Sequence, residues 1–165
     1  MDTRPTVYVE TTVPSYLVAR PSRDALISVR QQMTRDWWAA AHSRFQLVVS
    51  EAVMEEIQQG DPAMVRERVR LVSGMRVIAV TPEVRELAHW YEVHIPVPAK
   101  AKDDALHLAC AVVAACDFLV TWNCSHLANA IVRRRLAVIN AKINKETPTI
   151  ATPEELQLPS YGAEQ

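Results

Sequence analysis

Glycine is scarce in this sequence, which has only three glycines among its 165 residues. None of them belongs to a GxGxxG fingerprint or a P-loop, and this argues against loops that cradle nucleotide phosphates. Cysteine is equally scarce, and no two cysteines form a CxxC pair. Their odd number argues for reduced thiols in a cytoplasmic protein rather than for a disulfide framework or a zinc site. The three cysteines are Cys110, Cys116 and Cys124.

Long apolar runs and a large net charge are also missing. No run approaches the roughly 18 apolar residues of a membrane span. The residues around Asp2 and Arg4 lack the pattern of a signal peptide, so we expect no membrane association. The formal net charge is −1, so a nucleic-acid partner would need a local basic patch.

The composition is that of an ordinary globular protein, with 49% hydrophobic and 22% charged residues. A chain of this length can bury a sizeable core, and the simplest organisation is one domain. We expect this domain to span residues 1–158 and the short polar tail, residues 159–165, to fray.

Short apolar runs rich in valine and isoleucine alternate with stretches of helical periodicity. The runs are typical of strands buried on both faces, and they cover residues 6–10, 46–50, 76–80, 117–121 and, more weakly, 149–151. The helical stretches cover residues 23–43, 50–58, 62–73, 82–92, 103–115 and 125–140. Strands that alternate with helices need crossover connections. The sequence therefore predicts an α/β fold with a short parallel sheet of four or five strands flanked by helices.

Acidic and polar residues follow several of the predicted strands. Glu10 ends the first strand, and the fourth runs into Thr121-Trp122-Asn123. Further acids open two of the helices, namely Glu51, Glu55, Glu56, Asp103 and Asp104. In open α/β sheets, ligands bind outside the carboxyl ends of the strands. Carboxylates that meet there repel one another unless a cation lies between them, and Mg²⁺ and Mn²⁺ are the usual cations. The alternative without a function is dipole stabilisation of acids at helix N-termini.

Four segments together resemble the PIN-domain family, and most closely its VapC-like members from toxin–antitoxin systems. The segments are YVETTVPSYL, SEAVMEEIQQGD, DDALHLACAVVAACDFLVTWNCSHLAN and IATPEEL, and they occur in the right order over roughly residues 6–156. The resemblance implies a compact parallel sheet and a metal-dependent ribonuclease with a cluster of acidic residues.

The resemblance also implies which residues form the site. The family's first acid falls on Glu10, its second on Glu56 with Glu55 as the alternative, and its third on Asp104. These acids would hold Mg²⁺ or Mn²⁺, and Asn123 at the fourth position would position a water. Aspartate is common at the first and fourth positions of the family. Glu10 is therefore one methylene longer and Asn123 removes one charge, which predicts a lower metal affinity and argues against a second ion.

Neighbouring residues extend the predicted site. Thr11, Thr121, His107 and His126 flank the acids, where they would orient water or hydrogen-bond the cluster. Arg133, Arg134 and Arg135, with Lys142 and Lys145, are the only basic concentration and would attract an RNA backbone. Several of these residues also have a purely structural interpretation. A lone histidine is often a packed residue, a basic run is often a solvated helix face, and Asp104 could cap its helix unless Asp103 does so.

The leading hypothesis is an endoribonuclease in which a metal-bound water attacks a phosphodiester, leaving a 5′-phosphate and a 3′-hydroxyl. In a toxin context we expect RNA as substrate, a cognate antitoxin and a homodimer. The second hypothesis is a degenerate PIN domain that acts as a binding or assembly module, and Asn123 favours it. Metal binding discriminates between the two. A flavodoxin-like or response-regulator domain would need a lysine and an isolated aspartate at strand ends, and Val80-Thr81 offers neither.

Overall fold

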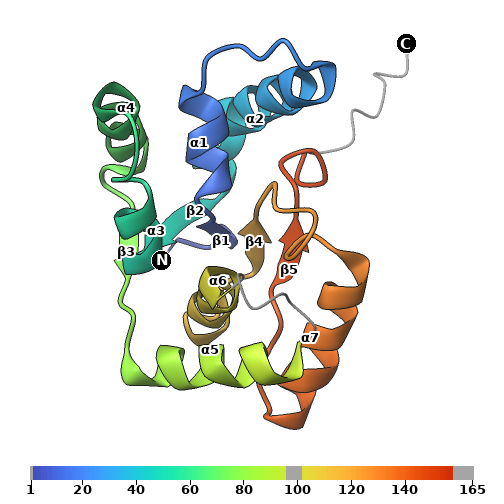
Figure 1. Cartoon of the computed structure of the whole chain (residues 1–165). Helices are drawn as coiled ribbons and strands as arrows, with labels where there is room; N and C mark the ends of the chain where they lie inside the picture. The colour runs from blue at the N-terminus through green and yellow to red at the C-terminus, as the bar shows by residue number, and fades with distance from the viewer. Residues whose placement is uncertain (1, 96–101, 158–165) are drawn as a thin grey trace.

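The computed structural model describes residues 2–95 and 102–157, so the tail that we expected to fray lies outside the described residues. The described residues form five strands and seven helices (Figure 1). The strands are β1 (Thr6–Val9), β2 (Gln46–Ser50), β3 (Arg76–Ile78), β4 (Phe118–Val120) and β5 (Thr149–Ala151). The helices are α1 (Thr12–Val18), α2 (Ala25–Arg44), α3 (Glu51–Glu56), α4 (Pro62–Val72), α5 (Pro82–His94), α6 (Lys102–Val113) and α7 (Ala130–Lys142).

The five strands form one parallel sheet in the order β3-β2-β1-β4-β5, which confirms the predicted fold class. From the central strand β1 the chain moves outward to β2 and β3 on one side, and it then crosses back to β4 and β5 on the other. Figure 1 shows α1, α2 and α4 on one side of the sheet and α5, α6 and α7 on the other. The connections therefore diverge between β1 and β4, and such a point opens a crevice at the carboxyl ends of the strands.

The local sequence explains where several helices begin. Side chains at five N-caps accept hydrogen bonds from amides of the first turn, which otherwise have no partner. These caps are Asp24, Ser50, Asp61, Thr81 and Asn129. Pro62 and Pro82 open α4 and α5, where a missing amide hydrogen costs no intrahelical bond.

The core lies on both faces of the sheet. Val7, Tyr8 and Val9 of β1 are completely buried, as are Leu119 and Val120 of β4. Three tryptophans contribute to this core, because Trp37 and Trp122 are buried and Trp38 packs against it. No helix in the described parts of the chain combines the length and the apolar character that crossing a membrane requires.

Some predicted boundaries are wrong. The helix predicted over 125–140 begins at Ala130, because the carbonyl of Asn123 accepts the amides of Leu127 and the following residue and closes a turn there. Residues 12–18, for which no range was predicted, form α1. The strand predicted over 76–80 ends at Ile78, and the Val80 amide donates to the Glu51 carboxylate at 2.7 Å instead of to a neighbouring strand.

Leu119 tests how much the sheet depends on its buried strands. It is completely buried in β4, between Tyr8 of β1 and Ile150 of β5 in the strand register. We expect Leu119→Ala to lower the free energy of unfolding by about 3 kcal/mol, because it removes buried methyl groups and leaves a cavity. Chemical denaturation measures this change. The control Val138→Ala, at an exposed position of α7, should stay within about 0.5 kcal/mol of wild type, and equal effects of the two changes would contradict the assignment.

Candidate active site

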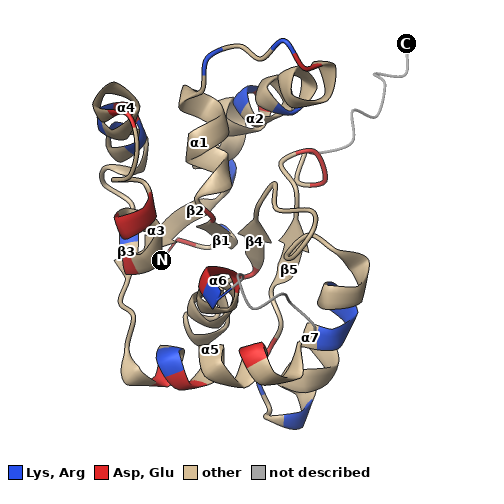
Figure 2. Cartoon of the chain, viewed as in Figure 1, with Lys and Arg blue, Asp and Glu red and all other residues tan. Residues whose placement is uncertain are grey.

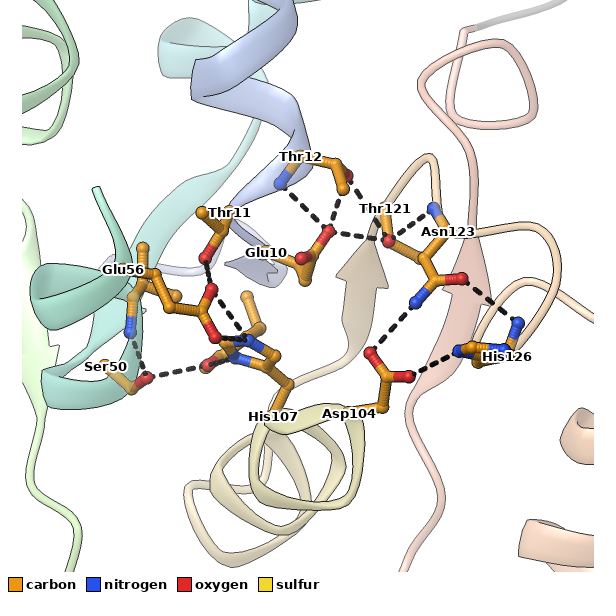
Figure 3. Close-up of polar contacts among 12 residues, drawn as sticks. Glu10, Thr11, Thr12, Ser50, Glu56, Asp104, His107, Thr121, Asn123 and His126 are labelled. Carbon is orange, nitrogen blue, oxygen red and sulfur yellow. Dashed lines mark hydrogen bonds and ion pairs between the residues drawn. The ribbon is translucent and has the colours of Figure 1, made fainter. Parts of the chain in front are cut away.

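The predicted acids meet at the carboxyl ends of the central strands (Figure 3). Glu10 follows β1, and Asn123 lies three residues after β4. Glu56 is the last residue of α3, while Asp104 and His107 lie one turn apart on α6. Short connections thus bring residues from four elements, far apart in the sequence, to one edge of the sheet.

Glu10 is only 5% exposed, and its two carboxylate oxygens have different surroundings. Oε2 accepts hydrogen bonds from the Thr12 amide at 3.1 Å, from the Thr12 hydroxyl and from the Thr121 hydroxyl at 2.7 Å. No described residue donates to Oε1, which Figure 3 shows on the side of Glu56 and His107. Oε1 is accessible to solvent rather than buried, so it can bind a cation that enters the crevice.

Glu56 and His107 form the second part of the site. His107 is 1% exposed, and its Nε2 lies 3.1 Å from Glu56 Oε1 and 3.3 Å from Oε2. The Thr11 hydroxyl also donates to Glu56. On its other side, His107 Nδ1 lies 2.7 Å from the Tyr8 hydroxyl, which in turn lies 2.7 Å from the Ser50 hydroxyl. The chain of contacts fixes His107 at both ring nitrogens.

Asp104 belongs to a third group of contacts, with residues that follow β4. The Asn123 side-chain amide donates to Asp104 Oδ1 at 2.9 Å, and His126 Nδ1 lies 2.9 Å from Oδ2. The oxygen of the same Asn123 amide accepts the His126 backbone amide at 3.1 Å. Both oxygens of Asp104 therefore have partners. Asp103, the other acid in this first turn of α6, is exposed.

The atoms that come closest to forming a metal site belong to Glu10, Glu56 and His107. One potential ligand atom from each of these residues lies within 4.8 Å of the other two. Asp104, the third ligand in the sequence prediction, is not among these donors. Glu55, the alternative to Glu56, is exposed. The assignment of ligands remains a prediction, but the structure brings Glu56 rather than Glu55 to Glu10.

No family model matches the chain, and no curated protein sequence matches it. Solved structures share its fold. One is a chain of VapBC2 from Rickettsia felis bound to a promoter DNA fragment, with 12% identity, a TM-score of 0.56, and a match over 89% of this chain and 98% of the other. A second is VapC20 of Mycobacterium tuberculosis, a Sarcin-Ricin loop cleaving toxin, with 21% identity, a TM-score of 0.53, and a match over 69% and 87%.

The chain has the PIN-domain fold. The fold expected from four short segments is therefore confirmed. At 12% and 21% identity, the similarity establishes the fold but not the activity.

The three arginines predicted to bind RNA do not all lie on one face of α7, because consecutive residues of a helix point about 100° apart. Arg134 and Arg135 line one surface hollow, and Arg133 lines another. Arg133 forms a 3.0 Å ion pair with Glu155, Arg135 donates to the carbonyl of His94 at 3.1 Å, and Arg134 is exposed. Figure 2 shows basic residues on several helices, with acidic residues on α3 and α6. RNA binding by these arginines remains a prediction.

The sequence prediction missed two residues that support the site. Tyr8 contacts His107 directly, and Ser50 contacts the Tyr8 hydroxyl. Tyr8 could have been found from the strand pattern, because it lies two residues before Glu10 and alternate residues of a strand share a face. The positions of Thr11, Thr121 and the two histidines agree with the flanking places that the sequence suggested.

Burial and close contacts change the charge state of the site. Burial disfavours a charged His107, but its hydrogen bond to Glu56 and the nearby carboxylates outweigh burial, so its pKa lies above the ordinary 6.5. Burial raises the pKa of Glu56, but His107 and Thr11 lower it more, and the pKa lies below 4.5. The pKa of Asp104 is raised from 3.8, because burial outweighs its contacts with the histidines and Asn123.

These directions predict how the metal-free protein responds to pH. The raised pKa of His107 gives stability below its unfolded value of 6.5, and the lowered pKa of Glu56 gives stability above its unfolded value of 4.5. The contribution of the pair is thus complete between these values, and it is lost as the pH rises through the folded pKa of His107 or falls through that of Glu56. Glu56→Gln should lower the pKa of His107, as measured by an NMR titration with chelator present.

The same titration of the exposed control Glu55→Gln should leave the pKa of His107 unchanged. A His107 pKa that does not differ between wild type and Glu56→Gln would contradict the ion pair.

Proposed function

We propose that this protein is a metal-dependent endoribonuclease and the toxin of a toxin–antitoxin pair. The observation that carries this proposal is the convergence of Glu10 and Glu56, with Asp104 one helix turn from His107, at the crevice of a PIN fold. A solved relative of this fold, VapC20, is described as a Sarcin-Ricin loop cleaving toxin. We propose RNA cleavage for this chain, but not the Sarcin-Ricin loop as its target.

The residues present fit a divalent cation. Glu10 Oε1 has no donor among the described residues, and the Glu56 carboxylate lies near it. Carboxylate oxygens are the protein ligands that Mg²⁺ and Mn²⁺ prefer, and Asp104 remains the predicted third acid. When bound, such an ion activates a water and stabilises the charge that develops on a phosphodiester.

The side chains of this protein would perform the remaining work. Hydrogen bonds from Thr12 and Thr121 hold Oε2 of Glu10, so that Oε1 keeps a fixed direction. Asn123 and His126 fix Asp104, whose raised pKa makes it a better proton acceptor than an exposed aspartate. We assign to Asp104 the proton that leaves the attacking water. The new P–O bond would form as the P–O3′ bond breaks, and the departing 3′ oxygen would take a proton from solvent, so the products would carry a 5′-phosphate and a 3′-hydroxyl.

The proposal includes the partners expected from the resemblance. A toxin requires an antitoxin that blocks its crevice, and the Rickettsia felis relative is named as the pair VapBC2. We therefore propose a cognate antitoxin protein, RNA as substrate, assembly as a homodimer and a cytoplasmic location, which the unpaired cysteines favour.

A second candidate function is binding without cleavage. Asn123 stands where the family commonly has an acid, and its amide occupies one oxygen of Asp104 while His126 occupies the other. This arrangement occupies both oxygens of Asp104, so a degenerate PIN domain that serves as a binding or assembly module is the alternative.

Calorimetric titration with Mn²⁺ tests the proposal before any RNA is chosen. We expect saturable binding by the wild type and its loss in Glu10→Gln and Glu56→Gln, because each change removes a ligand charge. Glu55→Gln is a matched control, since it makes the same change at the exposed neighbour and should bind Mn²⁺ normally. In RNA cleavage assays, Asp104→Asn should lower the Mn²⁺-dependent rate by about 100-fold or more.

The absence of binding up to several millimolar Mn²⁺ would overturn the nuclease proposal and favour the binding module. Metal binding that survives both Glu10→Gln and Glu56→Gln would place the ion elsewhere in the protein.

A further inference from the structure

His107 is a buried imidazole whose role the acidic cluster alone does not explain. It comes from the second turn of α6 and lies between the Glu56 carboxylate at Nε2 and the Tyr8 hydroxyl at Nδ1. The closest donor atoms of the site include this residue and leave out Asp104.

We propose that Nε2 of His107 is a direct ligand of the divalent ion, and that this nitrogen makes the site prefer Mn²⁺ to Mg²⁺. The inference rests on the proposed function, because it concerns the same ion. It adds an imidazole nitrogen to a set of protein ligands that would otherwise be oxygen alone.

The position of the nitrogen is the first argument. Nε2 lies 3.1 Å from Glu56 Oε1, and one atom of each of the three residues lies within 4.8 Å of the others. Two neighbouring ligands that are each about 2.1 Å from an ion in octahedral geometry are about 3 Å apart. The separation of the two atoms therefore suits ligands of one ion as well as a hydrogen bond.

The orientation of the ring is the second argument. The Ser50 hydroxyl oxygen accepts the Val53 amide at 3.3 Å and lies 2.7 Å from the Tyr8 hydroxyl. Tyr8 can therefore donate to Ser50 and accept the proton on Nδ1 of His107, so that an ion which displaces the proton shared between Nε2 and Glu56 meets the Nε2 lone pair. Histidines that bind metals commonly donate their other nitrogen in this way.

The third argument is the oxygen of Glu10 that has no partner. Glu10 as a whole is only 5% exposed, and its Oε1, to which no described residue donates, is the oxygen that solvent can still reach. This oxygen faces the same space as Nε2 of His107 in Figure 3. Asp104 differs, because Asn123 and His126 contact both of its oxygens. An ion between Glu10, Glu56 and His107 would supply the partner that Oε1 lacks.

The chemistry of the ligands gives the metal preference. Mg²⁺ favours oxygen ligands and retains water, whereas imidazole binds first-row transition ions better. A nitrogen among the ligands should thus favour Mn²⁺ over Mg²⁺. A site formed by carboxylates alone should discriminate much less between these two ions.

The test compares Mn²⁺ and Mg²⁺ binding by the full chain, using calorimetry and competition. We expect the wild type to bind Mn²⁺ at least about tenfold more tightly than Mg²⁺, and His107→Gln to lower the Mn²⁺ affinity by about 10- to 100-fold and bring the ratio toward one. Tyr8→Phe, which keeps the ring and removes the hydroxyl, should weaken Mn²⁺ binding by about tenfold. His89→Gln, at an exposed histidine, is the matched control and should change neither affinity.

Pulsed electron paramagnetic resonance of bound Mn²⁺ supplies a readout that a structural role would not produce. A coupling to an imidazole nitrogen in the wild type, absent in His107→Gln, is the expected result. If His107→Gln does not fold, the coupling in the wild type and its retention with weaker binding in Tyr8→Phe still test the proposal.

Mn²⁺ binding without nitrogen coupling would overturn this inference and leave the proposed function standing, with His107 as a hydrogen-bond partner of Glu56. Binding of neither ion would overturn both. Nitrogen coupling that persists in a folded His107→Gln protein would assign the ligand to another histidine and also overturn the inference.

Discussion

The repulsion between carboxylates at one partly buried sheet edge is the constraint on which the site depends. The strand order brings the residues that follow β1 and β4 together, and α3 and α6 add further acids to the same crevice. Carboxylates in such a place are stable only when donors or positive charges surround them. The surrounding residues are accordingly hydroxyls, an amide and imidazoles, namely Thr11, Thr12, Thr121, Asn123, His107 and His126.

This constraint divides the crevice into two parts with different properties. Glu10, Glu56 and His107 form a deep part, in which one carboxylate oxygen lacks a described donor. Asp104 and Asn123 form the other part with His126, and every carboxylate oxygen there has a partner. An ion would stabilise the first part most. The carboxylate oxygens of the second part already have partners, which suits this part to hold a substrate or a water in a fixed direction.

An asparagine instead of an aspartate at position 123 changes the hydrogen bonds of the site as well as its charge. An aspartate at this place would repel Asp104, whereas the amide donates to it and accepts from the His126 backbone. The loss of one charge is therefore accompanied by a new contact that keeps Asp104 in place. This compensation explains how the crevice can retain its shape with one acid fewer.

The sequence allowed the sheet to be predicted because its strands are short, apolar and separated by helical periods, as in β1 and β4. It also placed Glu10 and Asn123 at the crevice, since both follow such strands. It did not decide between Glu55 and Glu56, because both lie at the end of a short helix and only the packing of α3 makes one exposed. The start of α7 was wrong for a similar reason, since the turn after Asn123 depends on backbone contacts.

The contact between Tyr8 and His107 could not be predicted from local sequence patterns. The two residues are 99 positions apart, and they meet because α6 packs under the end of β1. Periodicity shows that each side chain points inward, but the 2.7 Å contact between their polar atoms depends on the angle between helix and strand. Histidine in an apolar helix looks like a core residue in the sequence. Here burial and function need not compete, because the contacts that bury His107 also direct its second nitrogen at the acids.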